Sequence, residues 1–145
     1  MKIAIVVASN GLVAKELLHV AEDTVGHVGN ISAIDFHNGE SLDELLGCYK
    51  AAILRLNAQH GILFLIAGEN SCHQFIASQF LREYNNSQII IGVNLTMLVS
   101  LMLYENNETD IQLLTLKAQQ YGKNAIHAVN VKTYEGDNEI FDDTI

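Results

Sequence analysis

Four short apolar runs, rich in β-branched residues, mark the first two thirds of the chain. They span residues 3–8, 31–36, 62–67 and 89–93, and each is followed by a polar or glycine-bearing turn. An apolar run of this length is typical of a strand that is buried on both faces of a parallel sheet. The pattern therefore predicts four central strands.

Helical periodicity fills the intervals between these runs. It covers residues 12–24, 42–56 and 74–84, and the second of these segments is opened by the capping box Ser41-x-x-Glu44. Strands that alternate with helices in this way predict an open, mainly parallel four-stranded α/β sheet with helices on both faces. The ligand site of such a sheet lies in the loops after the carboxyl ends of the strands.

The pattern changes after the fourth apolar run. A short helix is predicted over residues 96–104, and Thr109-x-x-Gln112 predicts the start of a longer helix that runs to about Tyr121. Residues 126–131 alternate loosely, which predicts a late edge strand. We expect one domain over residues 1–134, followed by an acidic, solvated tail over residues 135–145.

Composition narrows the class of protein. Hydrophobic residues make up 49% of the 145 residues and charged residues 17%, which suits a globular domain and excludes global disorder. A formal net charge of −9 disfavours nucleic acid and anionic membrane surfaces as partners. No apolar run approaches the roughly 18 residues of a spanning helix, and no secretory leader is recognised. Cys48 and Cys72 show no metal or redox spacing, so we expect a reduced, cytoplasmic protein.

The loops after the four predicted strands are the places to look for chemistry. They comprise residues 8–11, 37–40, 68–73 and 94–96. None of them carries a G-x-G-x-x-G, a phosphate-binding G-x-x-x-x-G-K-[ST] or a G-x-S-x-G motif. Dinucleotide, P-loop nucleotide and serine-hydrolase functions therefore lose their main support, and we expect no cofactor.

The segments "MKIAIVVASNGLVAKELL", "IDFHNGES", "GILFLIA" and "IIIGVNLTMLVSLM" carry a family resemblance. Their order resembles the enzyme IIA component of the mannose-type family of the bacterial phosphoenolpyruvate-dependent sugar phosphotransferase system (PTS), from residue 2 to about residue 128. The resemblance implies a four-stranded parallel sheet and a homodimer in which a C-terminal strand is exchanged between subunits. That strand would correspond to residues 126–131.

The resemblance also implies a function and a site. In the family, a histidine at the end of the first strand takes a phosphoryl group from the carrier protein HPr and passes it to a IIB partner. In this sequence that position is Asn10, within Ala8-Ser9-Asn10-Gly11. A carboxamide nitrogen is delocalised into its carbonyl and is a poor nucleophile, so we expect Asn10 to be unable to accept the phosphoryl group.

Other family positions of the same pocket are also changed. Ala67 stands where the family has an aspartate that orients the histidine, and Asn70-Ser71-Cys72-His73 replaces a Gly-Gly-Ser/Thr-Pro turn. Glu69 adds a carboxylate where a dianion would bind. Several changes in one pocket favour natural divergence over a single engineered substitution. The remaining residues that the resemblance places around the pocket are Ser9, Gly11, Asn94 and Thr96.

Three functions stay open on the sequence. The first is a non-catalytic IIA protein that docks HPr or IIB as a regulatory or assembly partner, with membrane contact only through PTS permease subunits. The second is an active carrier that uses another residue such as His73. The third is a small-molecule binding module lined by Ser9, Asn10, Glu69 and His73. A metal site from Glu69, Cys72 and His73 is disfavoured because the spacing matches no common zinc pattern, and the sugar specificity is not encoded in a readable motif.

Overall fold

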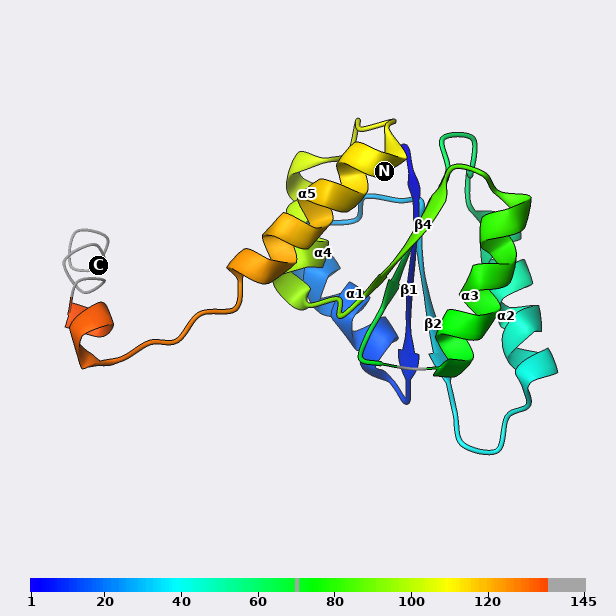
Figure 1. Cartoon of the computed structure of the whole chain (residues 1–145), viewed down its shortest axis with the longest axis horizontal. Helices are drawn as coiled ribbons and strands as arrows, with labels where there is room; N and C mark the ends of the chain where they lie inside the picture. Colours follow the sequence, from blue (N-terminus) through cyan, green and yellow to red (C-terminus); the bar gives the residue numbers. More distant parts are fainter. Residues whose placement is uncertain (70, 136–145) are drawn as a thin grey trace.

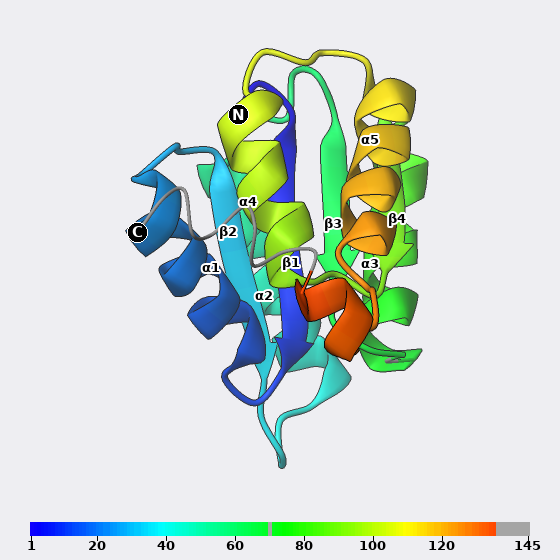
Figure 2. The same cartoon turned by 90° about the vertical axis from the view of Figure 1, so that its left-hand side faces the viewer.

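Four parallel strands form the centre of the molecule. The computed structural model describes residues 1–69 and 71–135, and its sheet has the strand order β2-β1-β3-β4 (Figure 2). All three pairings are parallel, as predicted from the unbroken apolar runs. The strands are β1 (Ala4–Asn10), β2 (Ile31–Phe36), β3 (Ile62–Ile66) and β4 (Ser87–Ile91).

Helices cover both faces of this sheet, so the predicted fold class is confirmed. Helices α1, α4 and α5 lie on one face, and α2 and α3 lie on the other (Figure 1). Among the described residues, none of the helices has the length and apolar character needed to cross a membrane. The helices that cover the sheet are α1 (Val13–Val25), α2 (Leu42–Arg55), α3 (Ser71–Glu83), α4 (Leu95–Tyr104) and α5 (Ile111–Asn124).

Strand β1 divides the apolar interior into two halves. Ile5 and Val7 point to the α1, α4 and α5 side, whereas Val6 and Ala8 point to the α2 and α3 side. All four side chains are fully buried. The alternation of a strand places successive side chains on opposite faces, so an unbroken apolar run supplies both halves of the interior.

Two helix starts and one strand start show how local chemistry sets the boundaries. Ser41 caps α2 as predicted, with its Oγ accepting a hydrogen bond of 3.1 Å from the Glu44 amide. The predicted cap Thr109 is wrong: Asp110 caps α5 by accepting from the amides of residues 112 and 113. Strand β4 begins two residues before the predicted run, because Ser87 and Gln88 pair with β3 although they are polar.

The segment after α5 differs from the prediction. Residues 126–130 carry no regular secondary structure, and a short helix follows over residues 131–135. This segment leads away from the sheet (Figure 1). The prediction of an edge strand over residues 126–131 is therefore wrong for the described chain, because no strand of this chain lies beside that segment. Exchange of the segment between subunits stays a prediction. The predicted tail lies outside the described residues from residue 136 onward.

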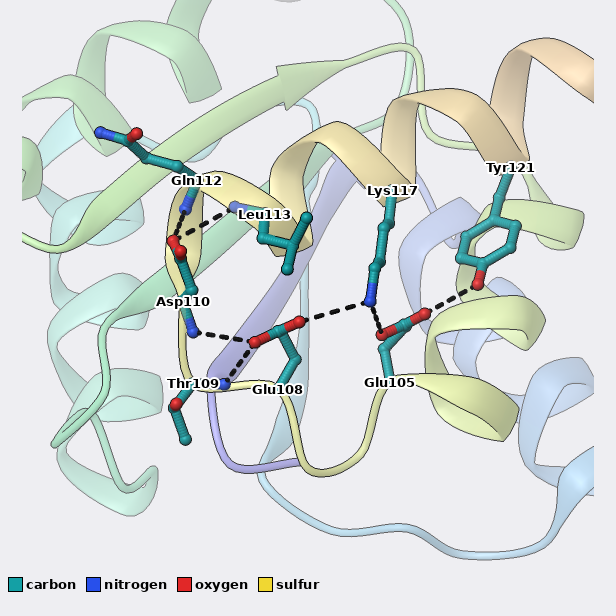
Figure 3. A network of polar contacts seen from close by, with 8 residues as sticks. All are labelled: Glu105, Glu108, Thr109, Asp110, Gln112, Leu113, Lys117 and Tyr121. Atoms are coloured by element: carbon teal, nitrogen blue, oxygen red, sulfur yellow. Dashed lines mark hydrogen bonds and ion pairs between the residues drawn. The ribbon is translucent and has the colours of Figure 1, made fainter.

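A polar cluster joins the end of α4 to α5 (Figure 3). Glu105 follows α4 and is only 7% exposed. Its carboxylate accepts from the Lys117 Nζ at 3.0 Å and from the Tyr121 hydroxyl at 2.8 Å. Lys117 also pairs with Glu108 at 3.3 Å. We call Glu105, Glu108, Lys117 and Tyr121 the α4–α5 cluster; it fixes α5 against the connection that precedes it.

Candidate functional site

The strand order sets the loop that follows β1 beside the loop that follows β3, and we call this position in the fold the crevice. From β1 the chain crosses to β2 at one edge of the sheet, whereas β3 and β4 lie toward the other edge. The carboxyl ends of β1 and β3 therefore flank the topological switch point, where open α/β sheets bind ligands. Asn10 is the last residue of β1 and is exposed. Gly11 turns the chain into α1 at a φ of +69°, and its amide donates to the Phe36 carbonyl at 3.1 Å.

Ser9 and Asp35 build the floor beneath this turn. Ser9 Oγ donates a 2.5 Å hydrogen bond to Asp35 Oδ1 and accepts one of 2.6 Å from the Ala14 amide. The Asp35 carboxylate also accepts from the amides of Ala14 at 3.0 Å and Lys15 at 3.2 Å. Leu12, at the N-cap position, offers no side-chain cap. The N-terminus of α1 is therefore capped by a carboxylate from β2, a residue that the sequence analysis did not select.

His73 lies inside the protein beneath the same turn. It belongs to the first turn of α3 and is 0% exposed. Its Nε2 lies 2.7 Å from the Ser9 carbonyl oxygen, and its Nδ1 lies 2.8 Å from the Tyr49 hydroxyl. Because a carbonyl only accepts, the proton is assigned to Nε2, and the neutral ring then accepts the Tyr49 hydroxyl at Nδ1.

Burial sets the protonation state of this pair. Desolvation lowers the pKa of His73, against smaller opposing effects of the Ser9 carbonyl and the Asp35 charge. Desolvation also raises the pKa of the Tyr49 hydroxyl. The imidazole is thus held neutral, with both nitrogens engaged. We call Ser9, Asp35, Tyr49 and His73 the carboxyl-end cluster.

The residues predicted after β3 lie on the other side of the crevice. The Ala67 amide donates to the Ala8 carbonyl at 2.9 Å, which ties the ends of β3 and β1 together. Ala67 and Cys72 are half-buried and Glu69 is exposed. Ser71 begins α3, and residue 70 lies outside the described residues. In residues 1–69 and 71–135, no group of three or more His, Cys, Asp or Glu residues could hold a metal ion.

Asn94 and Thr96 lie after β4, at the edge of the sheet. Asn94 caps α4 through a 2.9 Å bond from the Met97 amide to its Oδ1. Its Nδ2 donates to the Gly122 carbonyl at 2.9 Å. Thr96 is exposed in the first turn of α4. The contacts of Asn94 therefore run to α5, whereas Ser9 and His73 meet beneath the crevice.

An apolar groove of about 360 Å³ lies beside the Asn10 turn. Leu12 and Val13 contribute to its lining and are 60% and 51% exposed. The remaining lining residues come from α1 and the start of α4: Glu16, Leu17, Val20 and Leu95. Exposed apolar residues gathered in one groove are typical of contact surfaces.

Comparison with known proteins identifies the family. The family model described as "PTS system fructose IIA component" matches residues 4–118. The chain belongs to this family of IIA components. The mannose-type PTS resemblance expected from the sequence is thereby confirmed.

Curated relatives agree with this assignment. The IIA chain is 30% identical over 135 residues to the "PTS system mannose-specific EIIAB component" of Escherichia coli K12. The match covers 93% of this chain and 42% of that protein. This chain therefore spans less than half the length of the curated relatives that it matches.

Solved structures share the fold. The phosphotransferase system component EIIA from Streptococcus agalactiae has a TM-score of 0.76 and 20% identity, with 87% of this chain and 96% of that chain covered. The mannose/sorbose-specific IIA subunit from Enterococcus faecalis has a TM-score of 0.75 and 19% identity, with 90% and 97% covered. At these identities the similarity concerns the fold alone.

Proposed function

We propose that this IIA protein of sugar uptake does not carry the phosphoryl group itself and acts as a regulatory or assembly partner in the PTS. The observation that carries the proposal is the residue at the switch point. An exposed carboxamide, Asn10, ends β1 at the position that the resemblance assigns to the phosphohistidine. A carboxamide nitrogen lacks the free lone pair with which an imidazole attacks phosphorus.

The surroundings of Asn10 support the same proposal. The α1 amides of Ala14 and Lys15, which could have faced an anion, already bind the Asp35 carboxylate. Ala67 supplies no carboxylate to orient an imidazole at position 10. Glu69 adds a negative charge in the loop after β3. These features disfavour a bound dianion at the mouth of the crevice.

Transfer through His73 is disfavoured by its environment. A nucleophilic imidazole needs a nitrogen lone pair that reaches the donor phosphate. The His73 side chain is fully buried, its Nδ1 faces the Tyr49 hydroxyl and its Nε2 faces the Ser9 carbonyl. A phosphoryl group on either nitrogen would require the ring to give up one of these contacts and its burial. The same contacts suit a histidine that shapes the Asn10 turn.

The surface features support partner binding. The groove lined by Leu12, Val13 and Leu95 adjoins the Asn10 turn, where HPr or a IIB protein would dock if the family's surface is retained. Ile126, Val129, Val131 and Tyr134 are exposed after α5, which supports a homodimer that covers this segment. The proposal places the protein in the cytoplasm, with membrane contact only through permease subunits.

Intact-mass spectrometry tests the proposal. The native protein and the Asn10→His, Asn10→His/Ala67→Asp and Asn38→His variants are incubated with phosphoenolpyruvate, enzyme I and HPr, and are kept at neutral to alkaline pH because phosphohistidine is acid-labile. We expect no phosphoryl group on the native chain. We expect one on Asn10→His, in higher yield when the added Ala67→Asp substitution supplies a carboxylate that orients the ring.

Asn38→His is the matched control. Asn38-Gly39 is a second exposed Asn-Gly turn that follows a strand, in this case β2, so it presents a new histidine away from the switch point. This variant should stay unmodified. A phosphoryl group on the native chain would contradict the proposal, and its position in a peptide map would identify the true carrier.

A further inference from the structure

A polar hollow lies at the end of the sheet opposite the Asn10 turn, where the strands begin. Its volume is about 440 Å³. Lys2 precedes β1, Asn30 precedes β2, Arg55 ends α2, and Asn57 and His60 lead into β3. In Figure 1 this end of the molecule is marked by the N-terminus. Met1 completes the lining.

Asn30 holds the three chain segments of this hollow together. It has a φ of +61°, the left-handed region that asparagine tolerates better than most residues. Its Nδ2 donates to the carbonyls of Met1 at 2.9 Å and Asn57 at 3.0 Å. Its Oδ1 accepts from the Asn57 amide at 2.8 Å. The frame of the hollow is therefore set by hydrogen bonds before any ligand arrives.

The charge around the hollow is opposite in sign to that of the whole chain. The lining contains Lys2, Arg55 and His60 and no carboxylate, although the chain has a net charge of −9. The sequence shows the same asymmetry. Residues 1–15 and 45–68 contain no Asp or Glu, yet they include four of the eight Lys and Arg residues: Lys2, Lys15, Lys50 and Arg55.

One acidic segment that approaches the hollow is the connection between α4 and α5. It approaches Lys2, whose amide donates to the Asn106 carbonyl at 2.9 Å. Its carboxylates at Glu105 and Glu108 are already paired with Lys117. In the described part of the chain neither Lys2 nor Arg55 forms an ion pair. A concave surface lined by one sign of charge concentrates the field there.

We propose that this hollow binds a small polyanion, a phosphate-bearing or polycarboxylate molecule, at a site separate from the Asn10 crevice. Two fixed positive charges match a ligand with at least two negative charges. The His60 ring and the amides of Asn30 and Asn57 surround them with polar groups, which suits a hydrophilic ligand rather than an apolar one. The inference does not depend on the role proposed for Asn10.

An NMR titration tests this site. Pyrophosphate is added to the ¹⁵N-labelled native protein at constant ionic strength, and citrate is added in a parallel series. We expect saturable shifts of the backbone amides of Asn30, Asn57 and His60. In the Lys2→Gln/Arg55→Gln variant the apparent Kd should rise by roughly tenfold or more. A larger affinity for pyrophosphate indicates a phosphate ligand, and a larger affinity for citrate indicates a polycarboxylate.

The control removes two charges elsewhere. Lys123→Gln/Lys132→Gln has the same net charge as the test variant, and both of its lysines are exposed and lie outside the hollow. It should bind with native affinity. Shifts that rise linearly without saturation, or equal weakening in the two double variants, would overturn the proposal. The amide spectra of the unbound variants show whether each keeps its fold.

Discussion

Two clusters of polar side chains lie at opposite ends of the sheet and are built in different ways. The carboxyl-end cluster of Ser9, Asp35, Tyr49 and His73 joins residues that are 24 to 64 positions apart. The α4–α5 cluster joins residues that are 9 to 16 positions apart. The first cluster holds one carboxylate among neutral groups and backbone amides, whereas the second pairs two carboxylates with one lysine.

The difference separates two ways of fixing a loop. In the α4–α5 cluster, opposite charges compensate one another within a single helical hairpin. In the carboxyl-end cluster, side chains from β2, α2 and α3 converge on β1 and on the start of α1. Disruption of the α4–α5 cluster therefore loosens one connection, while disruption of the carboxyl-end cluster affects the turn that carries Asn10.

The largest expected effect is that of Asp35→Asn. The new amide keeps one acceptor oxygen but places a donor group among the Ser9 hydroxyl and the amides of Ala14 and Lys15, which all donate to the native carboxylate. We expect the free energy of unfolding to fall by roughly 2–3 kcal/mol. Urea denaturation followed by circular dichroism measures this change.

Asp110→Asn is the matched control, because Asp110 caps α5 at an exposed position. Asparagine and aspartate are nearly equal as exposed N-caps, so the loss should stay below about 0.5 kcal/mol. Equal losses in the two variants would show that Asp35 is an ordinary helix cap rather than the centre of a buried cluster.

Lys117→Met should have an intermediate effect. It leaves the Glu105 carboxylate, whose side chain is 9% exposed, with the Tyr121 hydroxyl as its remaining partner in the cluster. Lys117 itself is 34% exposed, so solvent screens part of the pair, and we expect a smaller loss of stability than for Asp35→Asn. Chemical denaturation measures it.

A double-mutant cycle shows whether the loss comes from the stranded carboxylate. Glu105→Gln/Lys117→Met should be more stable than Lys117→Met alone, because the buried charge is removed. Strictly additive losses from the two single variants would contradict the pairing of Glu105 with Lys117 as the source of the effect.

The smallest expected effect is a dependence of the protein's stability on pH, caused by His73 in the carboxyl-end cluster. Burial lowers the pKa of His73 in the folded chain below its ordinary value of 6.5. Between the lowered pKa and pH 6.5, the unfolded chain therefore binds more protons than the folded chain. The stability from the neutral ring is fully present above about pH 6.5 and declines as the pH falls below it. Denaturation midpoints measured at a series of pH values below about 6.5 should show this decline in stability.

Two variants locate this dependence. His73→Gln should flatten the slope below pH 6.5, whatever its absolute stability. His127→Gln should keep the native slope, because the His127 side chain is exposed and takes part in none of the ion pairs among the described residues. A native slope in His73→Gln would assign the effect to other groups.

The order of strands and helices could be predicted because the interior of the sheet is apolar on both faces. Each predicted run in β1, β2 and β3 coincides with a strand to within two residues. The strand boundaries could be predicted less well where polar residues pair in the sheet or where apolar residues do not. Ser87 and Gln88 belong to the edge strand β4 through backbone pairing alone, and the apolar residues of 126–131 read as a strand although no neighbouring strand of the described chain pairs with them.

The site could be placed from the sequence only in part. The loops after β1 and β3 follow from topology, and the chemistry of Asn10 follows from its side chain. The role of Asp35 depends on the register that sets Ser9 opposite it in the sheet. The position of His73 depends on the packing of α3 against α2, which brings its ring to Tyr49. No local motif encodes either contact.

The Asn10 side chain is exposed, whereas other residues hold its turn in place, and this division has an evolutionary consequence. Each asparagine codon differs from a histidine codon in a single base, and two of the four alanine codons differ from an aspartate codon in a single base. The contacts of Ser9, Asp35 and His73 that shape the turn involve no side-chain atom of position 10 or position 67. Point mutations at these two positions can therefore change the chemistry offered at the crevice while selection for a folded domain continues to act on other residues.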